Sequence, residues 1–306
     1  MNRDSLFVEN ASITFQQEYP GRQFLLRLYA PRIAERTRAG HFVHVTCDPL
    51  RPLRRPLSIL RASPKEGWIE LLYRVVGEGT ALLSQRSAGE TVNLLGPIGQ
   101  PFQIDTTPGA RPLLIGGGIG MPPMIALADQ LRHIDGVEPF VAIGSEQPFP
   151  FTPARSPRRL PGIDAAVDAA MPLLEEWEID SRLATRNGIP GCLDGWVTDL
   201  AEQWLLGLDT TARQQVHIYA CGPHPMLEAV AALAHRHDLP CQVSLEAFMA
   251  CGLGGCAGCT VAVREDDGQV AMKRVCVDGP VFDARRVFPG GIEVRHPAAS
   301  GCAATA

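Results

Sequence analysis

The sequence predicts a small β-barrel followed by a parallel-sheet α/β domain and a short cysteine-rich C-terminal segment. Three observations lead to this fold class: short strand-like runs separated by turns up to about residue 100, strands alternating with helices after that, and clustered Cys and Gly from residue 245. A chain of 306 residues is long enough for two or three compact modules. We expect a barrel over 1–105, an α/β domain over 106–242 with an insertion at about 144–191, a metal-binding segment over 243–296, and a flexible tail over 297–306.

The barrel is predicted from runs of apolar and alternating residues. Alternation of buried and exposed positions is typical of a half-buried strand. The clearest strands are expected at Phe24–Tyr29, His41–Val45 and Trp68–Val76, with about one helical turn near Thr80–Gln85.

The α/β domain is predicted from apolar runs that alternate with helical patterns. Strands are expected at Pro112–Ile115, Pro139–Ile143 and Val216–Ala220, and helices at Met124–Arg132, Gly195–Leu206 and Met226–His237. The segment 144–191 is rich in Pro and Arg, so we expect a surface insertion without regular structure, apart from a short helix at Pro172–Trp177.

Composition excludes several classes of function. The formal net charge of −5 argues against a general affinity for nucleic acid or anionic membranes. No apolar run has the length of a membrane span, and the N-terminus lacks the pattern of a secretory signal. We therefore expect a cytoplasmic, reducing location, in which nine cysteines are not best explained by disulfides.

Four of these cysteines form a pattern that indicates a metal centre. Cys251, Cys256, Cys259 and Cys276 have the spacing Cys-x4-Cys-x2-Cys-x16-Cys, whose first three positions match a plant-type two-iron ferredoxin. Glycines fill the loop, as a tight turn that aims backbone N–H groups at sulfur requires. The alternative is a structural zinc site, although zinc sites usually show two separated Cys-x2-Cys pairs. We expect Cys276 to lie on a strand over Arg274–Asp278.

Two strings in the barrel region suggest a flavin site. Arg55-Pro56-Leu57-Ser58 offers a guanidinium fork for phosphate and a hydroxyl for the flavin ring. Leu72-Tyr73-Arg74 and Gly79-Thr80 resemble the second half of such a site, where glycine allows pyrophosphate to approach a helix. Each string alone would fit an ordinary turn, and their order along the chain favours the flavin interpretation.

Two further strings suggest a nicotinamide nucleotide site. Gly116-Gly117-Gly118-Ile119-Gly120 follows a predicted strand and begins a helix, the context of a phosphate-binding turn, although the dinucleotide fingerprint has another spacing. Cys221-Gly222-Pro223, with Met226 downstream, follows a second predicted strand. A plain strand-to-helix turn is the alternative for each.

Taken together, these strings resemble the electron-transfer subunit of NAD-dependent dihydroorotate dehydrogenase, within the ferredoxin–NADP reductase superfamily. Two further segments carry the resemblance, Ser244–Gly252 and, most specifically, Val275-Cys276-Val277-Asp278-Gly279-Pro280-Val281-Phe282. The resemblance implies FAD on the barrel, a 2Fe-2S cluster at the four cysteines and NAD on the α/β domain. It also implies a partner, an FMN-containing dihydroorotate-oxidising catalytic subunit, commonly in a heterotetramer.

Electrons would then pass from dihydroorotate to FMN, and through the cluster and FAD to NAD+. No residue of this chain is expected to act as a catalytic acid or base, because hydride exchange with a flavin needs none. The segment 144–191 is longer than the family pattern. An alternative is therefore an NAD(P)H-dependent ferredoxin or sulfide reductase-type subunit with a different partner. A zinc-stabilised binding module is an alternative from another class.

Overall fold

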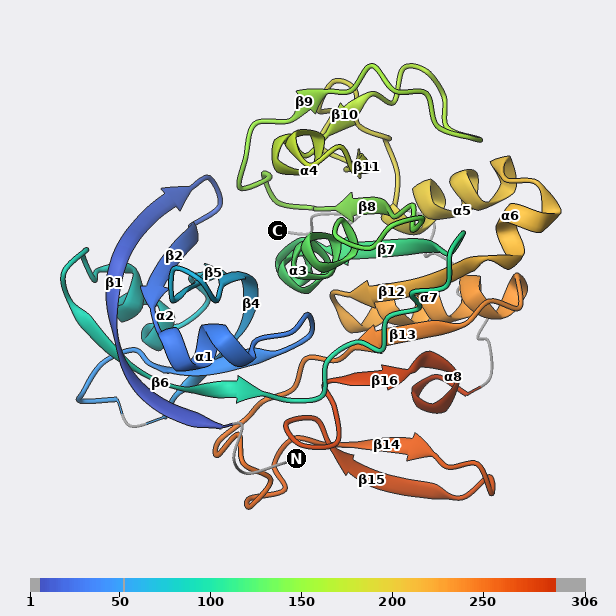
Figure 1. Ribbon diagram of the computed structural model, residues 1–306. Helices are drawn as coiled ribbons and strands as arrows, with labels where there is room; N and C mark the ends of the chain where they lie inside the picture. The colour runs from blue at the N-terminus through green and yellow to red at the C-terminus, as the bar shows by residue number, and fades with distance from the viewer. Residues whose placement is uncertain (1–5, 52, 290–306) are drawn as a thin grey trace, which may run out of the picture.

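The computed structural model describes residues 6–51 and 53–289. Six strands form a closed antiparallel barrel at the N-terminal end, in the order β1-β2-β5-β4-β3-β6. Figure 1 shows the barrel beside the open sheet of the second half of the chain. The barrel elements are β1 (Phe7–Tyr19), β2 (Gln23–Tyr29), α1 (Pro31–Arg36), β3 (Phe42–Thr46), β4 (Arg55–Ser63), β5 (Trp68–Arg74), α2 (Glu78–Ser84) and β6 (Thr91–Ile98).

The predicted barrel strands are confirmed to within two residues at their ends. Strand β3 shows why the alternation forms a barrel wall: Val43 and Val45 point into the barrel core, while Phe42 packs with residues outside it. A buried carboxylate joins three strands, because Glu70 of β5 is paired with Arg27 of β2 at 2.7 Å and Arg61 of β4 at 2.6 Å. Both carboxylate oxygens of Glu70 are thus compensated inside the protein.

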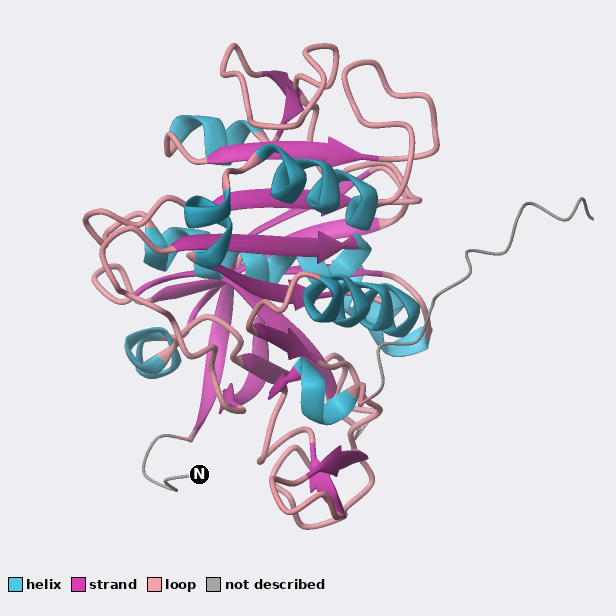
Figure 2. Cartoon of the chain, turned by 90° about the vertical axis from the view of Figure 1, so that its right-hand side faces the viewer, coloured by secondary structure: helices cyan, strands magenta, loops and turns pink. Residues whose placement is uncertain are grey.

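The second half of the chain forms a six-stranded sheet with helices on both faces. The strand order is β11-β8-β7-β12-β13-β16, parallel except for the last strand. Figure 2 shows the stacked strands with helices on either side. The elements are β7 (Arg111–Gly117), η2 (Gly118–Gly120), α3 (Met121–Leu131), β8 (Phe140–Gly144), β9 (Ala154–Arg155), β10 (Ala169–Ala170), α4 (Pro172–Glu176), β11 (Asp180–Ala184), α5 (Val197–Gly207), α6 (Thr210–Gln214), β12 (Val216–Cys221), α7 (His224–Arg236), β13 (Cys241–Ser244), β16 (Val281–Asp283) and α8 (Ala284–Val287).

Alternate residues of β7 divide the core into two apolar layers. Leu113 and Ile115 pack with the cluster that includes α5 and α7, whereas Leu114 packs with α3. Helix α3 also packs against β4, so it joins the barrel to the sheet. Through this contact of α3, the carboxyl ends of the sheet strands lie next to the barrel. Ligands of α/β folds bind at these strand ends.

The prediction for the segment 144–191 is partly wrong. Its short helix is confirmed as α4, but the segment also contains an edge strand of the main sheet, β11, parallel to β8. The sequence pattern did not predict this strand, Asp180-Ser181-Arg182-Leu183-Ala184, because two of its buried residues, Ser181 and Arg182, are polar. Arg182 is accommodated because its guanidinium donates to the carbonyls of Val167 and Ser181, at 2.8 and 2.6 Å.

The last described part of the chain is a cysteine loop and a small hairpin, β14 (Thr260–Arg264) and β15 (Val270–Arg274). The expected strand over Arg274–Asp278 is wrong: β15 ends at Arg274, and Cys276 lies in a turn. The turn is closed by Val277 N and Asp278 N, which donate to Arg274 O, and by the Asp278 carboxylate, which accepts from Arg274 N. The predicted flexible tail 297–306 lies outside the described residues.

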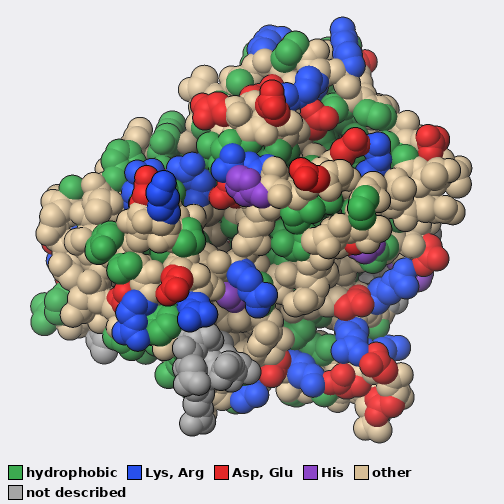
Figure 3. Space-filling model, in the orientation of Figure 1, with side chains coloured by type: hydrophobic (Ala, Val, Ile, Leu, Met, Phe, Trp, Pro, Cys, Tyr) green, Lys and Arg blue, Asp and Glu red, His purple; other side chains and the backbone are tan. Residues whose placement is uncertain are grey.

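Within the described ranges, no helix combines the length and apolar character that crossing a bilayer requires. Figure 3 shows basic and acidic side chains interspersed over the face seen in Figure 1.

Candidate functional site

The four motif cysteines come together as two pairs of thiols. The sulfur atoms of Cys259 and Cys276 are 3.3 Å apart and both side chains are buried. The thiol of Cys251 is hydrogen-bonded by that of Cys256, which is exposed. Cys276 also interacts with the Cys251 thiol and the backbone of Gly254, so the two pairs are neighbours. A two-iron cluster needs two protein ligands on each iron, which suits this pairing.

Backbone amides of the loop point at the sulfurs. Leu253 N donates to Cys251 Sγ and Gly258 N to Cys256 Sγ, each at 3.4 Å. Gly252 and Gly254 have φ of +66° and +80°, conformations that a side chain would strain. N–H donors aimed at sulfur are a property of iron–sulfur sites, because they stabilise negative charge on the cluster.

Cys251 and Cys276, one thiol from each pair, differ in pKa. Desolvation raises the pKa of Cys251, but hydrogen bonds from the amides of Leu253, Cys256 and Gly255 and from the Cys256 thiol outweigh it and bring the pKa to about 6. Burial, followed by the neighbouring Cys259 thiol, raises the pKa of Cys276 to about 12. Cys251 is thus ready to ligate at neutral pH, and metal binding itself deprotonates a coordinating thiol. Among the described residues, no three or more His, Cys, Asp or Glu side chains lie close enough together to hold one metal ion, so the four cysteines form two neighbouring pairs and not a single four-thiol group.

On the barrel, Arg55 lies against the first turn of α2. A Cβ added to Gly79 would lie 2.8 Å from Arg55 Nε, so only glycine leaves room for the guanidinium. Thr80 organises this turn: its hydroxyl accepts from Val76 N at 3.1 Å and donates to Gly77 O at 3.0 Å. The structure therefore brings the two flavin-type strings together. Pro56, Leu57 and Ser58 follow on β4, half-buried.

Two of the predicted flavin residues turn their side chains away. Tyr73 is buried in the barrel core, where its ring stacks on Phe24 at 5.5 Å and its hydroxyl meets Gln16 Oε1 at 3.3 Å. Leu72 is buried against α3. Only their main chain can face a ligand, whereas Arg74 is exposed.

The two glycine strings of the α/β domain also meet. Gly116, Cys221 and Ser244 are in register at the carboxyl ends of β7, β12 and β13. A Cβ on Gly120 would lie 2.4 Å from Cys221 O, and one on Gly117 would lie 2.2 Å from Met226 Sδ.

The open surface between these strings is a suitable place for phosphate. Gly118 has a φ of +54° with no atom within 4 Å of an added Cβ, so space remains there just before α3. Ile119 is half-buried beside it, and Gly222 and Pro223 precede α7 opposite, with Pro223 at its N-cap. Burial keeps the Cys221 thiol neutral by raising its pKa, with Glu246 acting in the same direction and a Ser244 hydrogen bond opposing.

The sequence patterns missed two polar residues at the junction of the three sites. Surrounding protein raises the pKa of Glu246, just beyond β13, and Arg74 of the barrel partly offsets this rise, although part of the Glu246 side chain still faces solvent. His44 of β3 is fully buried against Gly252 of the cysteine loop, and burial and Arg54 lower its pKa to about 4. Glu246 could have been noticed because it follows a strand end in line with Cys221; His44 carries no sequence signal beyond its place in an alternating strand.

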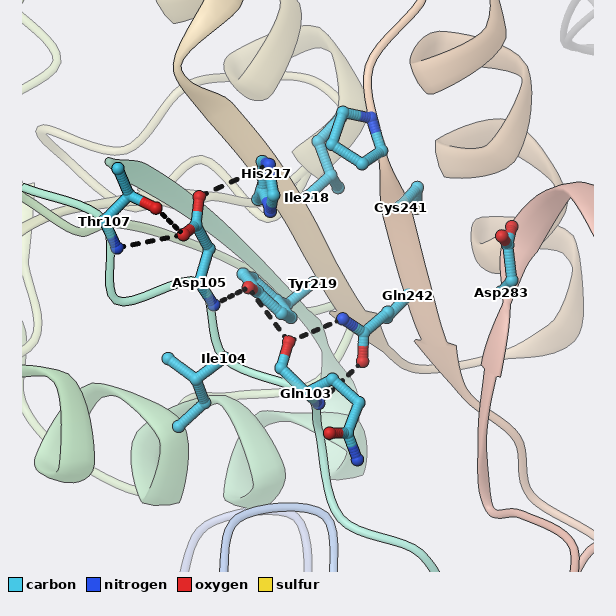
Figure 4. A pocket seen from close by; sticks show the side chains of 11 residues that line it. Gln103, Ile104, Asp105, Thr107, His217, Ile218, Tyr219, Cys241, Gln242 and Asp283 are labelled. Atoms are coloured by element: carbon cyan, nitrogen blue, oxygen red, sulfur yellow. Dashed lines mark hydrogen bonds and ion pairs between the residues drawn. The ribbon is translucent and has the colours of Figure 1, made fainter. Parts of the chain in front are cut away.

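A cavity of about 570 Å³ lies elsewhere, at the amino ends of β12 and β13, whereas the glycine turns lie at the carboxyl ends of the strands. Figure 4 shows His217 near the start of β12 facing Asp105 at 3.4 Å, with the Tyr219 hydroxyl accepting from Asp105 N at 3.1 Å. These groups bond to one another and lie away from the glycine turns. The cavity is therefore separate from the candidate nucleotide site.

Comparison with known proteins agrees with this geometry. The family model described as the iron–sulfur cluster binding domain of dihydroorotate dehydrogenase B matches residues 246–288. The chain is 37 % identical over 287 residues to the dihydroorotate dehydrogenase B (NAD(+)) electron transfer subunit of Bacillus caldolyticus, covering 91 % of this chain and 98 % of that relative. The chain belongs to this family. The subunit of the same name from Desulforamulus reducens is 34 % identical and covers 86 % of this chain and 92 % of its own length.

Solved structures of other electron-transfer proteins share the fold of this chain. The structure of an NADH-dependent reduced ferredoxin-NADP oxidoreductase superposes with a TM-score of 0.74 at 24 % identity, covering 91 % of this chain and 90 % of that one. Phthalate dioxygenase reductase superposes with a TM-score of 0.53 at 17 % identity, over 87 % of this chain and 76 % of that one. The barrel, the parallel sheet and the C-terminal iron–sulfur domain thus form the fold that the sequence predicted.

Proposed function

We propose that this chain is the electron transfer subunit of a dihydroorotate dehydrogenase, in the pathway of pyrimidine biosynthesis. Electrons from an FMN-containing catalytic subunit pass through a 2Fe-2S cluster and FAD to NAD+. The observation that carries this function is that the loop holding the two thiol pairs packs through Gly252 on His44 of β3, the strand paired with the β4 string Arg55–Ser58. Each of the three proposed units, 1–105, 106–242 and 243–296, then holds one cofactor.

The chain's own residues hold the cofactors and orient them. Cys251, Cys256, Cys259 and Cys276 ligate the cluster, and the amides of Leu253 and Gly258 support its thiolates. Arg55 pairs with the FAD diphosphate, and Ser58 reaches the flavin ring. Gly116–Gly120 and Cys221–Pro223 with Met226 form the NAD site. When bound, the flavin exchanges single electrons with iron and a hydride with nicotinamide.

The location of the exposed thiol pair indicates how the partner is reached. Cys251 and Cys256 face the surface, whereas Cys259 and Cys276 face the protein core. Phe248, in the same loop region, is 99 % exposed. We infer that the catalytic subunit covers this exposed edge, because exposed aromatic side chains are frequent anchors at interfaces. The assembly is a heterotetramer.

The cofactor content of anaerobically purified protein tests this function. We expect FAD and two irons with two acid-labile sulfides per chain, and a paramagnetic signal after reduction. Cys256→Ser, at an exposed position, should abolish that signal while NADH still reduces a dye through FAD. Cys192→Ser is the matched control, at a half-buried cysteine outside the motif. It should keep both the paramagnetic signal and NADH–dye reduction.

Two results would overturn the assignment. One is a fully loaded protein that contains zinc and no iron. The other is loss of NADH–dye reduction in folded, FAD-containing Cys256→Ser protein, because the electron order would then be wrong.

The partner is tested by co-purification from the native cell. Co-elution with an FMN protein that oxidises dihydroorotate supports the proposal. Electron transfer to ferredoxin or from sulfide, with no response to such a partner, would favour the alternative reductase function.

A further inference from the structure

His44 is a fully buried imidazole whose two ring nitrogens have no hydrogen-bond partner among residues 6–51 and 53–289. A neutral imidazole carries one N–H donor and one acceptor. Leaving a buried donor unsatisfied is unfavourable because the group loses its hydrogen bonds to water, so such groups in folded proteins usually have a partner. His41, a nearby buried histidine, follows this rule, because its Nδ1 accepts from Arg38 N at 3.0 Å.

The ring of His44 faces the cysteine loop. A Cβ on Gly252 would lie 2.9 Å from Cε1, 3.0 Å from Nδ1 and 3.2 Å from Nε2 of His44. The nearly equal distances place the face of the ring over Gly252, the residue after Cys251. Glycine at this position therefore allows the imidazole to approach the loop.

The neighbours of His44 belong to the same contact between barrel and loop. Phe42, two residues earlier on β3, lies 5.9 Å from the imidazole between ring centroids and shares an apolar cluster with Cys259 and Cys276. Across the ladder, His44 is opposite Pro56 and Phe42 is opposite Ser58 of the flavin-type string. His44 thus lies on β3 directly beside the flavin-type string of β4 and against the loop that carries the thiols.

We propose that His44 donates an N–H···S hydrogen bond to the iron–sulfur cluster held by this loop and thereby raises its reduction potential. The inference rests on the proposed function, since it requires the cluster. We assign the acceptor as a sulfur of this centre because His44 packs on Gly252, the residue next to the ligand Cys251. A donor to sulfur stabilises the additional negative charge of the reduced cluster. The hydrogen bond also satisfies the buried donor of His44.

Isotope labelling tests the contact in unchanged protein. The full chain is prepared with 15N-histidine and reduced, and hyperfine spectroscopy is recorded on its paramagnetic iron signal. We expect a weak histidine nitrogen coupling that is present in the wild type and in His41→Phe and lost in His44→Phe. An iron signal without histidine coupling would overturn this inference alone, whereas the absence of any iron signal would overturn the proposed function.

A potentiometric titration of the same iron signal tests the effect. His44→Phe should shift the midpoint of the cluster to a more negative potential, and His44→Gln, which retains an N–H donor, should shift it less. His41→Phe, at a buried histidine that already has its own partner, should leave it unchanged. An unaltered midpoint in His44→Phe protein that retains its cluster would refute the role. If that variant does not hold a cluster, the coupling in labelled wild-type protein decides.

Discussion

Buried polar side chains in this protein differ according to whether the chain itself supplies their partners. Glu70 is enclosed by Arg27 and Arg61, and Arg182 by backbone carbonyls, so both are structural. Arg55 is only half-buried, and its Nη1 donates to Leu53 O at 2.8 Å. Its other donors remain available to phosphate beside Gly79. Arg55 is therefore suited to an anionic ligand, because Gly79 leaves room for the guanidinium and several of its N–H donors remain unused in the described part of the chain.

Arg55→Ala should therefore weaken FAD retention. Loss of charge-assisted hydrogen bonds is worth about 1.5–3 kcal/mol, so we expect FAD binding about tenfold to a hundredfold weaker. The flavin-to-protein ratio after gel filtration and an FAD titration measure the change. Arg36→Ala, on exposed α1, is the control and should retain full flavin. Unchanged flavin content in Arg55→Ala would contradict the assignment.

His41 should make the free energy of unfolding of the protein depend on pH. Burial, followed by Arg38, lowers its pKa from 6.5 to about 4. Between these values the unfolded chain binds more protons than the folded one, so the free energy of unfolding falls as the pH decreases from 6.5 towards 4. The contribution of this one imidazole is on the order of 3 kcal/mol.

Denaturant unfolding at pH 7 and pH 4.5 measures this effect. We expect His41→Gln to reduce the difference in unfolding free energy between the two pH values. His133→Gln, at an exposed histidine, should leave the difference as in the wild type. An equal pH dependence in His41→Gln would show that other groups cause the acid sensitivity.

At the scale of elements, the parallel register of β7, β12 and β13 creates the candidate nucleotide site. The register places Gly116, Cys221 and Ser244 side by side, and the turns that follow touch without side chains between them. Sequence reasoning could predict these turns because each glycine string follows an apolar run. It could not predict β11, since Ser181 and Arg182 become acceptable in a strand only through partners elsewhere in the chain.

Gly120→Ala should disrupt the contact between the two turns. The added Cβ would lie 2.4 Å from Cys221 O, a backbone atom that cannot easily move. We expect the free energy of unfolding to fall by about 1–3 kcal/mol and the KM for NADH to rise. Thermal unfolding and NADH–dye kinetics measure both quantities. In Gly195→Ala the nearest atom to the added Cβ is Asp199 Oδ2, at 3.2 Å, followed by Leu193 side-chain atoms at 3.8 Å, and no backbone atom lies within 4 Å, so this variant should be tolerated. Equal behaviour of the two variants would contradict the close contact.

At the scale of the whole molecule, the cysteine loop lies between the barrel and solvent. One thiol pair packs with the core and the other faces outward, beside the exposed Phe248 and the 53 % exposed Leu253. In the proposed function, this arrangement gives the electron carrier one side towards the flavin-type string and leaves the other side accessible to the catalytic subunit. Figure 1 shows the loop below the barrel strand β6, and the hairpin β14–β15 below β16 and α8 of the sheet.

Phe248→Ser should weaken binding of the catalytic subunit without loss of cofactors. An exposed aromatic anchor at an interface contributes about 2 kcal/mol or more, so we expect the Kd to rise at least about tenfold. Calorimetry with the purified partner measures this, and the iron and flavin contents confirm loading. Leu206→Ser, 60 % exposed on α5, is the control and should bind normally. An unchanged affinity in Phe248→Ser would place the interface elsewhere.

The sequence by itself determined the fold class, the order of the three units along the chain and the four cysteines, because strand alternation, glycine turns and thiol spacing are local patterns. Only the tertiary structure decided which of these patterns face one another. The pairing of Cys259 with Cys276, the contact of His44 with Gly252 and the inward turn of Tyr73 depend on strand register and packing between residues far apart in the chain. Burial and hydrogen-bond partners are properties of that packing, so no local pattern could have predicted them.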